Sequence, residues 1–154
     1  MTGGRYAEGT MVSVGRTREE IERTLARYGA TGFAFGQDEA GAMVAFLVRG
    51  RHVRFRVPLP QLDDFALTPT RQKRTRASAT AALEKATRSR WRSLGLIVKA
   101  KLEAVDAGVV EFDDEFMAQL VMPDGRTVGD AVRGQLVTAI ESGAVPALLP
   151  GGAR

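Results

Sequence analysis

Basic side chains at helical spacing are the residues of this sequence best suited to contact an anion. The stretch EKATRSRWRSLGLIVKAKLEAV, residues 84–105, has no proline, and a rotation of about 100° per residue would place four of its basic residues on one stripe of a helix. These four are Lys85, Arg88, Arg92 and Lys99. Guanidinium and ammonium groups bind phosphate, and guanidinium can do so through paired hydrogen bonds. The stripe also has a plainer interpretation, as the solvated side of a core helix.

The excess of positive charge extends beyond this stripe. Between Arg49 and Lys101 the sequence holds fourteen Lys and Arg residues and three Asp and Glu residues, a net charge of +11, whereas residues 1–48 carry −1 and residues 102–154 carry −6. An excess of one sign destabilises a folded chain unless an opposite charge is supplied, and nucleic-acid phosphates supply it while releasing their counterions. We therefore predict that nine residues from strand, loop and helix converge on one exterior surface that binds nucleic acid: Arg54, Arg56, Lys73, Arg74, Arg76, Lys85, Arg88, Arg92 and Lys99.

The same charge asymmetry supports a second interpretation. A basic middle region can dock on the acidic C-terminal region of another copy of the chain, or on an acidic partner. The apolar, proline-broken tail PALLPGGAR, residues 146–154, would then bridge subunits. Two function classes therefore stay open, a nucleic-acid-binding protein and an oligomeric assembly protein, and we expect a homo-oligomer.

The sequence offers little for catalysis. It has no cysteine and one histidine, His52, which excludes disulfides and thiolate zinc sites and leaves a histidine metal site or catalytic triad without partners. The phosphate-binding and hydrolase motifs with fixed spacing are absent. The acidic run EFDDEF, residues 111–116, could hold Mg²⁺ together with Asp63 and Asp64, as in a metal-dependent nuclease, but the N-terminus of a helix explains it more simply. We expect no catalytic residue, no metal and no cofactor.

The chain length of 154 residues, 44% hydrophobic and 26% charged, suits one domain with its own core. We expect a flexible N-terminal segment over residues 1–15 and a single domain over residues 16–150. Thr17 is expected to cap a short first helix that ends at Gly29. Three strands are then expected to form an antiparallel meander, over residues 31–36, 42–48 and 52–59.

The rest of the domain is predicted to be mainly helical. Residues 60–79 are expected to form a long basic loop, and a long helix should follow over residues 78–107. The acidic C-terminal region, residues 109–150, is expected to hold a short helix from Asp113, a turn at residues 123–125, and a helix from Thr127 to Gly143. The predicted fold class is α+β: a three-stranded antiparallel meander packed by a long amphipathic helix, with smaller C-terminal helices.

Alternation and helical periodicity indicate how the layers meet. Val53 and Phe55 fall on the apolar face of the third strand, and Arg54 and Arg56 fall on its opposite face. On the long helix, Trp91 belongs to the apolar stripe that should cover the apolar face of the sheet. Trp91 could stack on an unpaired base, but its place on this stripe favours the core.

No segment of the sequence is predicted to enter a membrane. The first ten residues, MTGGRYAEGT, lack the basic and apolar regions of a signal peptide, and the longest apolar stretches are far too short to cross a bilayer. We therefore expect a cytoplasmic protein.

The order of a helix, a three-stranded meander and a long basic helix resembles the core of the single-strand annealing proteins, recombination mediators of phages and eukaryotes. The resemblance covers TGFAFG, AMVAFLV, HVRFRVPL and EKATRSRWRSLGLIVKAKL, within residues 31–105. It implies subunits of a ring or filament that hold DNA in a basic groove. The text RSRWRSLGLIVKAKLEAV, followed by MPDGRTVGD, is also similar to small proteins of actinobacterial phages and prophages, from which no activity follows.

These observations together predict a non-catalytic protein that binds nucleic acid, single-stranded DNA in particular, and promotes annealing in phage-type recombination. The alternative is an oligomeric assembly protein whose basic middle region docks on acidic surfaces.

Overall fold

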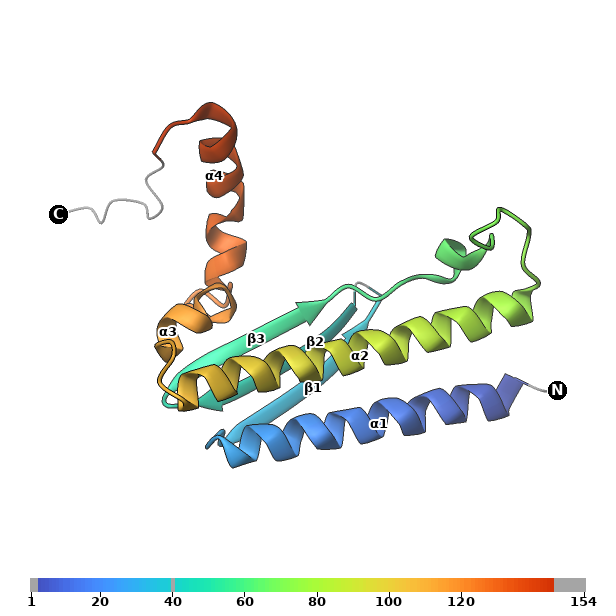
Figure 1. Ribbon diagram of the computed structural model, residues 1–154, viewed down its shortest axis with the longest axis horizontal. Helices are drawn as coiled ribbons and strands as arrows, with labels where there is room; N and C mark the ends of the chain where they lie inside the picture. The colour runs from blue at the N-terminus through green and yellow to red at the C-terminus, as the bar shows by residue number, and fades with distance from the viewer. Residues whose placement is uncertain (1–2, 40, 146–154) are drawn as a thin grey trace.

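The computed structural model describes residues 3–39 and 41–145 of the chain. Its elements are α1 (Gly3–Arg27), β1 (Gly32–Asp38), β2 (Gly41–Val48), β3 (Arg51–Val57), the 3₁₀ helix η1 (Leu62–Phe65), α2 (Arg76–Asp106), α3 (Phe112–Glu115), the 3₁₀ helix η2 (Met117–Gln119) and α4 (Val128–Ser142). The strands form an antiparallel sheet in the order β1-β2-β3, and α1 and α2 lie side by side across one face of it (Figure 1). The predicted α+β class, a meander packed by a long helix and followed by smaller C-terminal helices, is confirmed.

Alternation along the strands decides which face of the sheet is buried. Every second residue of β2 is buried, and the register aligns Val44 of β2 with Phe35 of β1 and with Phe55 of β3. The apolar residues of all three strands therefore share the face beneath the helices. Arg49 and Gly50 connect β2 to β3 with φ values of 51° and 72°, which are the two positive angles of a tight hairpin turn.

Helix α2 closes the core over this face. The hydroxyl of Thr75 accepts a hydrogen bond from the backbone N–H of Ser78 and caps its first turn, and Gly108, with φ of 71°, follows its end. The expected apolar stripe is buried, and Trp91 is only 1% exposed. Trp91 therefore belongs to the core, so its ring is not available to stack on a base.

Helix α1 begins earlier than the sequence indicated. The expected flexible segment, residues 1–15, is helical from Gly3 onward, and the expected helix start at Thr17 is wrong. Val14 is buried in the same core as Ile21 and Leu25, so the apolar stripe of the helix continues before Thr17, where no proline interrupts it.

The loop between β3 and α2 carries more structure than expected. It contains η1 and a short antiparallel bridge between Leu67 and Lys73, and α2 already begins at Arg76. The backbone N–H of Thr68 donates a hydrogen bond to the carbonyl oxygen of Gln72 at 2.8 Å, so the loop is stabilised by an internal hydrogen bond.

The C-terminal region attaches to the free edge of β3. Leu120 forms an antiparallel bridge with Val53, and a turn between Met122 and Arg126 then leads into α4. The expected cap is confirmed, because the Thr127 hydroxyl accepts a hydrogen bond from the N–H of Asp130 at 3.1 Å.

Helix α4 extends away from the sheet and has no buried residue (Figure 1). The tail from residue 146 onward, predicted to bridge subunits, lies outside the described residues. No helix in the described part of the chain is long and apolar enough to span a membrane.

Candidate functional site

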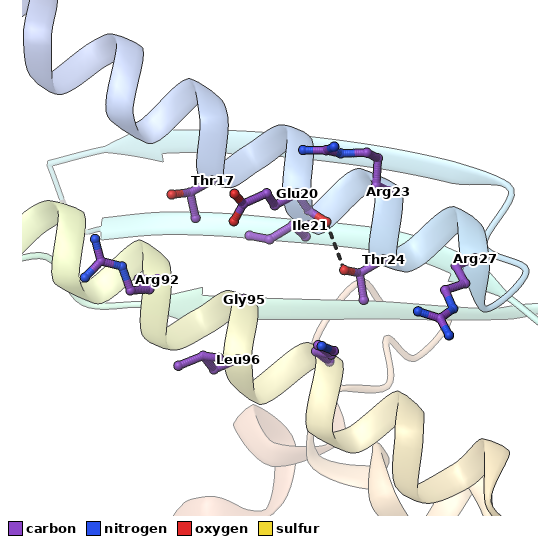
Figure 2. Close-up of a pocket in the computed structure, with 10 residues that line it drawn as sticks. Thr17, Glu20, Ile21, Arg23, Thr24, Arg27, Arg92, Gly95 and Leu96 are labelled. Carbon is purple, nitrogen blue, oxygen red and sulfur yellow. Dashed lines mark hydrogen bonds between the residues drawn. The ribbon is translucent and has the colours of Figure 1, made fainter.

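A groove runs between α1 and α2 on the side of the helices that faces away from the sheet. Its cavity is about 520 Å³, and both helices line it (Figure 2). Helix α1 contributes Thr17, Glu20, Ile21, Arg23, Thr24 and Arg27, and α2 contributes Arg92, Gly95, Leu96 and Lys99. Two members of the predicted basic stripe, Arg92 and Lys99, therefore lie in this groove, which we call the α1–α2 groove.

The floor of the α1–α2 groove depends on a close approach of the two helices. A Cβ atom placed on Gly95 would lie 3.3 Å from Cγ1 of Ile21, which is tighter than ordinary van der Waals contact. Because Gly95 has no side chain, Ile21 packs against the backbone of α2 and is only 2% exposed. The polar and basic residues one turn away on each helix then face each other across this contact.

The charge of the α1–α2 groove is predominantly positive. Its lining holds four basic residues, Arg23, Arg27, Arg92 and Lys99, and a single carboxylate, Glu20. In Figure 2 the Arg27 side chain extends from α1 toward α2, and the Arg92 side chain extends from α2 toward α1. Charges of one sign along a groove focus the electrostatic potential there and attract an anion.

Carboxylates of the same molecule neutralise few of these groups. Lys99 lies 3.7 Å from Glu103 in an ion pair whose two side chains are about half exposed, an arrangement that contributes little stability. Arg92 is exposed and forms neither an ion pair nor a hydrogen bond with any residue that the structure describes. The groove therefore presents cations whose counter-charge has to come from solution or from a ligand.

The remaining predicted residues of the long helix continue the same stripe. Lys85 is exposed and Arg88 is half-buried, and both precede Arg92 along α2. Lys85 and Lys99 are fourteen positions apart on the helix, or about 21 Å at 1.5 Å per residue. The structure thus brings these four residues together on one side of α2, as predicted.

Three predicted residues lie at the N-terminal end of the row. Lys73 and Arg74 belong to the end of the loop, and Arg76 is the first residue of α2, whose first turn has no acidic residue. Cations near the N-terminus of a helix oppose its dipole, so helix stability does not explain them. They extend the positive potential of the row toward that end of the helix.

The two predicted strand arginines do not join this surface, so the expected convergence of all nine residues is wrong. Val53 and Phe55 of β3 are buried beneath the helices, and alternation therefore turns Arg54 and Arg56 to the opposite face of the sheet. Nη2 of Arg54 donates to the carbonyl oxygen of Gly125 at 2.7 Å, which ties the C-terminal turn to β3. Arg56 lines a separate cavity, at the end of the sheet where β1 and β3 finish and β2 begins.

Sequence reasoning missed the contribution of α1. Arg23 and Arg27 are four residues apart and line the α1–α2 groove, but three acidic residues of the same helix, Glu19, Glu20 and Glu22, cancel them in any count along the chain. Their spacing of one helical turn was the available signal. A charge sum hides it because it ignores direction around the helix axis.

The acidic residues considered for a metal site are separated. Asp113 forms two hydrogen bonds with Arg51, both 2.9 Å long, and this pairing lowers the pKa of the Asp113 carboxyl. Asp63 and Asp64 lie in η1, and the Asp64 carboxylate accepts a hydrogen bond from the backbone of Gln61. Among the described residues, no three His, Asp or Glu side chains are grouped so that they could hold a metal ion.

Comparison with known proteins identified no relative. The chain matches no family model, and neither a curated protein nor a solved structure is significantly similar to it.

Proposed function

We propose that this protein binds nucleic acid without catalysing a reaction, and that its ligand is single-stranded DNA held along the α1–α2 groove. The observation that carries the proposal is the set of basic residues that two helices bring to one groove with a single carboxylate in its lining. The row along α2, about 21 Å long, matches about six nucleotides at the 3.4 Å spacing of one strand in B-form DNA.

The size of the groove favours one strand over two. A cavity of about 520 Å³ between adjacent helices can take a phosphate backbone with part of a sugar, whereas a duplex needs a surface wide enough for both of its backbones. Contacts with phosphates carry no sequence information, so binding depends on salt and is nearly independent of base sequence. Holding strands in this way would promote annealing, as in phage-type recombination. A cytoplasmic location is part of the proposal, and the absence of cysteine fits a reducing compartment.

A direct binding measurement tests the proposal. Fluorescence anisotropy of a labelled single-stranded oligonucleotide, titrated with the protein at two salt concentrations, should show binding that weakens steeply as salt rises. A duplex of the same sequence should bind more weakly. The absence of binding at low salt would remove the proposal.

One pair of variants separates groove binding from general attraction by charge. Arg92→Glu reverses a charge inside the α1–α2 groove, and Arg90→Glu makes the same change about 160° away around the same helix. Removal of one charge-assisted hydrogen bond should weaken binding by about tenfold for Arg92→Glu and much less for Arg90→Glu. Equal effects of the two variants would contradict a groove-bound strand.

Annealing requires its own measurement. Two complementary strands, one carrying a fluorophore and the other a quencher, report duplex formation as a loss of fluorescence. The wild-type protein should accelerate this loss, and Arg92→Glu should accelerate it less. If the protein binds single strands but leaves the annealing rate unchanged, the function is binding alone.

A second candidate function, assembly with other copies of the chain, is favoured by the exposed apolar side of α4. Leu136 and Ile140 are 47% and 73% exposed, and an isolated helix of fifteen residues is marginally stable in water. The face of the sheet opposite α1 and α2 presents an apolar row on β2, with Arg54 and Arg56 beside it on β3. On this candidate, α4 of a second copy covers that row, and its region of opposite charge meets the arginines.

Light scattering in the absence of nucleic acid tests the assembly candidate. The wild-type protein should form an oligomer that high salt weakens, and Leu136→Asp combined with Ile140→Asp should give a monomer. Gln135→Asp changes an exposed residue about 100° away from Leu136 around α4; it is the control and should leave the oligomer intact. A wild-type monomer at all concentrations would eliminate assembly through α4.

A further inference from the structure

A second cavity, of about 570 Å³, lies between the loop after β3 and the first half of α2. Its lining is mixed: apolar side chains, hydroxyl groups, one carboxylate and two cations. We call it the loop pocket, and its residues are Asp64, Phe65, Leu67, Thr68, Pro69, Arg74, Ala82, Lys85, Ala86 and Ser89. The lining contains no histidine and only one carboxylate, so it lacks the paired groups that acid–base catalysis commonly uses.

The helix side of the loop pocket is flat because its residues are small. Ala82, Ala86 and Ser89 follow one another at spacings of four and three residues, so they lie on one side of α2. None of these side chains extends far from the helix backbone. A planar ring can therefore approach the surface of α2 between the loop and the helix.

The loop side of the pocket supplies apolar and aromatic surface. Phe65 ends η1 and is partly exposed, and Leu67 is 49% exposed although it lies in the bridged part of the loop. The loop is held in place by its own hydrogen bonds, among them Arg74 N–H to the carbonyl oxygen of Ala66 at 2.9 Å. An aromatic side chain on an ordered loop opposite a flat helix surface is suited to hold a planar, partly apolar ring between them.

Two cations connect the loop pocket with the basic row. Lys85 lines the pocket and is also the first residue of the row that leads to Lys99, and Arg74 lines the pocket from the loop side. Neither side chain forms an ion pair with a residue that the structure describes. A ligand that combines a planar ring with a neighbouring phosphate would satisfy both parts of the pocket, and an unpaired nucleotide of a DNA strand has this chemistry.

We infer that the loop pocket holds one unstacked base of the strand whose backbone follows the row from Lys85 to Lys99. The inference rests on the proposed function and adds a reason for the preference for single strands, because a base can enter the pocket only if it is unpaired. The Ser89 hydroxyl and the Asp64 carboxylate can accept hydrogen bonds from a base. One oxygen of Asp64 already accepts from the backbone N–H of Gln61, and the Thr68 hydroxyl already accepts from the N–H of Gln72. Stacking of a base on an aromatic side chain is worth about 1–3 kcal/mol, or about five- to 150-fold in affinity.

The test combines a filled pocket with a strand that lacks bases. Ala86→Leu fills the loop pocket without disturbing helix propensity, and Ala100→Leu makes the same change on an exposed part of α2 outside the pocket. Affinities for an ordinary single strand and for an abasic strand of equal length are measured by anisotropy at one salt concentration, and circular dichroism confirms that both variants are folded.

The expected result is a loss of about tenfold for Ala86→Leu with the ordinary strand, little loss with the abasic strand, and little loss for Ala100→Leu with either strand. Equal affinity of the wild-type protein for ordinary and abasic strands would overturn the base pocket while leaving salt-dependent backbone binding intact. An equal loss for Ala86→Leu with both strands would overturn it too, since the substitution would then act on the backbone site. Failure of every strand to bind would instead remove the proposed function.

Discussion

The guanidinium carbon of Arg18 lies 4.7 Å from the centroid of the Trp91 ring, where it forms a cation–π contact between α1 and α2. Phe35 of β1 packs on the same tryptophan, with ring centroids 6.4 Å apart. Trp91 thereby joins both helices to the sheet. The most bulky side chain of the basic segment is therefore part of the core and not of the exposed surface.

Replacement of Trp91 tests this structural role. Trp91→Ala should lower the free energy of unfolding by about 3–5 kcal/mol, because it removes a fully buried aromatic side chain and leaves a cavity. Urea denaturation followed by circular dichroism measures the change. Leu96→Ala is the control on the same helix, and since Leu96 is 63% exposed its effect should stay within about 0.5 kcal/mol. A Trp91→Ala protein as stable as the wild type would contradict a core position.

The ion pair between Arg51 and Asp113 predicts a dependence of stability on pH. The hydrogen bonds from Arg51 lower the pKa of Asp113 in the folded state below its unfolded value, which is about 3.9. A lowered pKa contributes stability that is fully present above the unfolded pKa and is lost as the pH falls through the folded pKa. Asp113→Asn should therefore destabilise the protein at neutral pH, and the difference from the wild type should shrink in acid.

Denaturation of the wild type and Asp113→Asn across this pH range measures the effect. Asp114→Asn changes the adjacent carboxylate of the same helical turn, which has no ion pair with a described residue, and serves as the control. A constant difference between wild type and Asp113→Asn from neutral pH down to about pH 2 would show that the ion pair does not act through Asp113 ionisation.

Gly41, the first residue of β2, and Gly50, in the turn between β2 and β3, should lose different amounts of stability when each is replaced by alanine. Gly41 has φ of 150°, and a Cβ atom there would collide with the carbonyl oxygen of Val57 on β3. Gly50 has φ of 72°, but its Cβ position is open. Gly41→Ala should therefore combine a steric clash with backbone strain of about 1–3 kcal/mol, whereas Gly50→Ala should cost about 1–2 kcal/mol from conformation alone. Thermal denaturation ranks the two variants, and a larger loss for Gly50→Ala would contradict the sheet geometry.

Local signals in the sequence were sufficient for the three strands, for the long helix α2 and for its apolar stripe. Period-two alternation around Phe55, the apolar stripe around Trp91 and the Thr127 cap each depend on neighbours within a few residues, and all three were predicted correctly. The start of α1 is hard to predict because the glycines near the N-terminus disfavour a helix, while the apolar stripe that buries Val14 continues before Thr17.

The composition of the site was harder to predict because it depends on contacts between distant segments. The approach of Ile21 to Gly95 places Arg23 and Arg27 of α1 in the same groove as Arg92 and Lys99 of α2, and no local pattern encodes that pairing of helices. The position of Arg56 has a different explanation. The alternation of β3 assigns Arg56 to the face opposite the apolar residues, whereas the net charge of a segment carries no information about the face on which each residue lies.

Charge reversals in the α1–α2 groove and on the opposite face of the sheet distinguish which surface binds the DNA strand. Arg27 lies in the α1–α2 groove, so Arg27→Glu should weaken single-strand binding as Arg92→Glu does. The slope of log affinity against log salt should fall by about 0.7 for each phosphate that the protein no longer neutralises. Arg56→Glu changes the net charge equally on the opposite face and should leave affinity within about twofold and the slope unchanged. Because all three variants have the same net charge, a difference between them has to come from position. A decrease in affinity for Arg56→Glu as large as that for Arg27→Glu would move the binding surface to the open face of the sheet or show that only net charge matters.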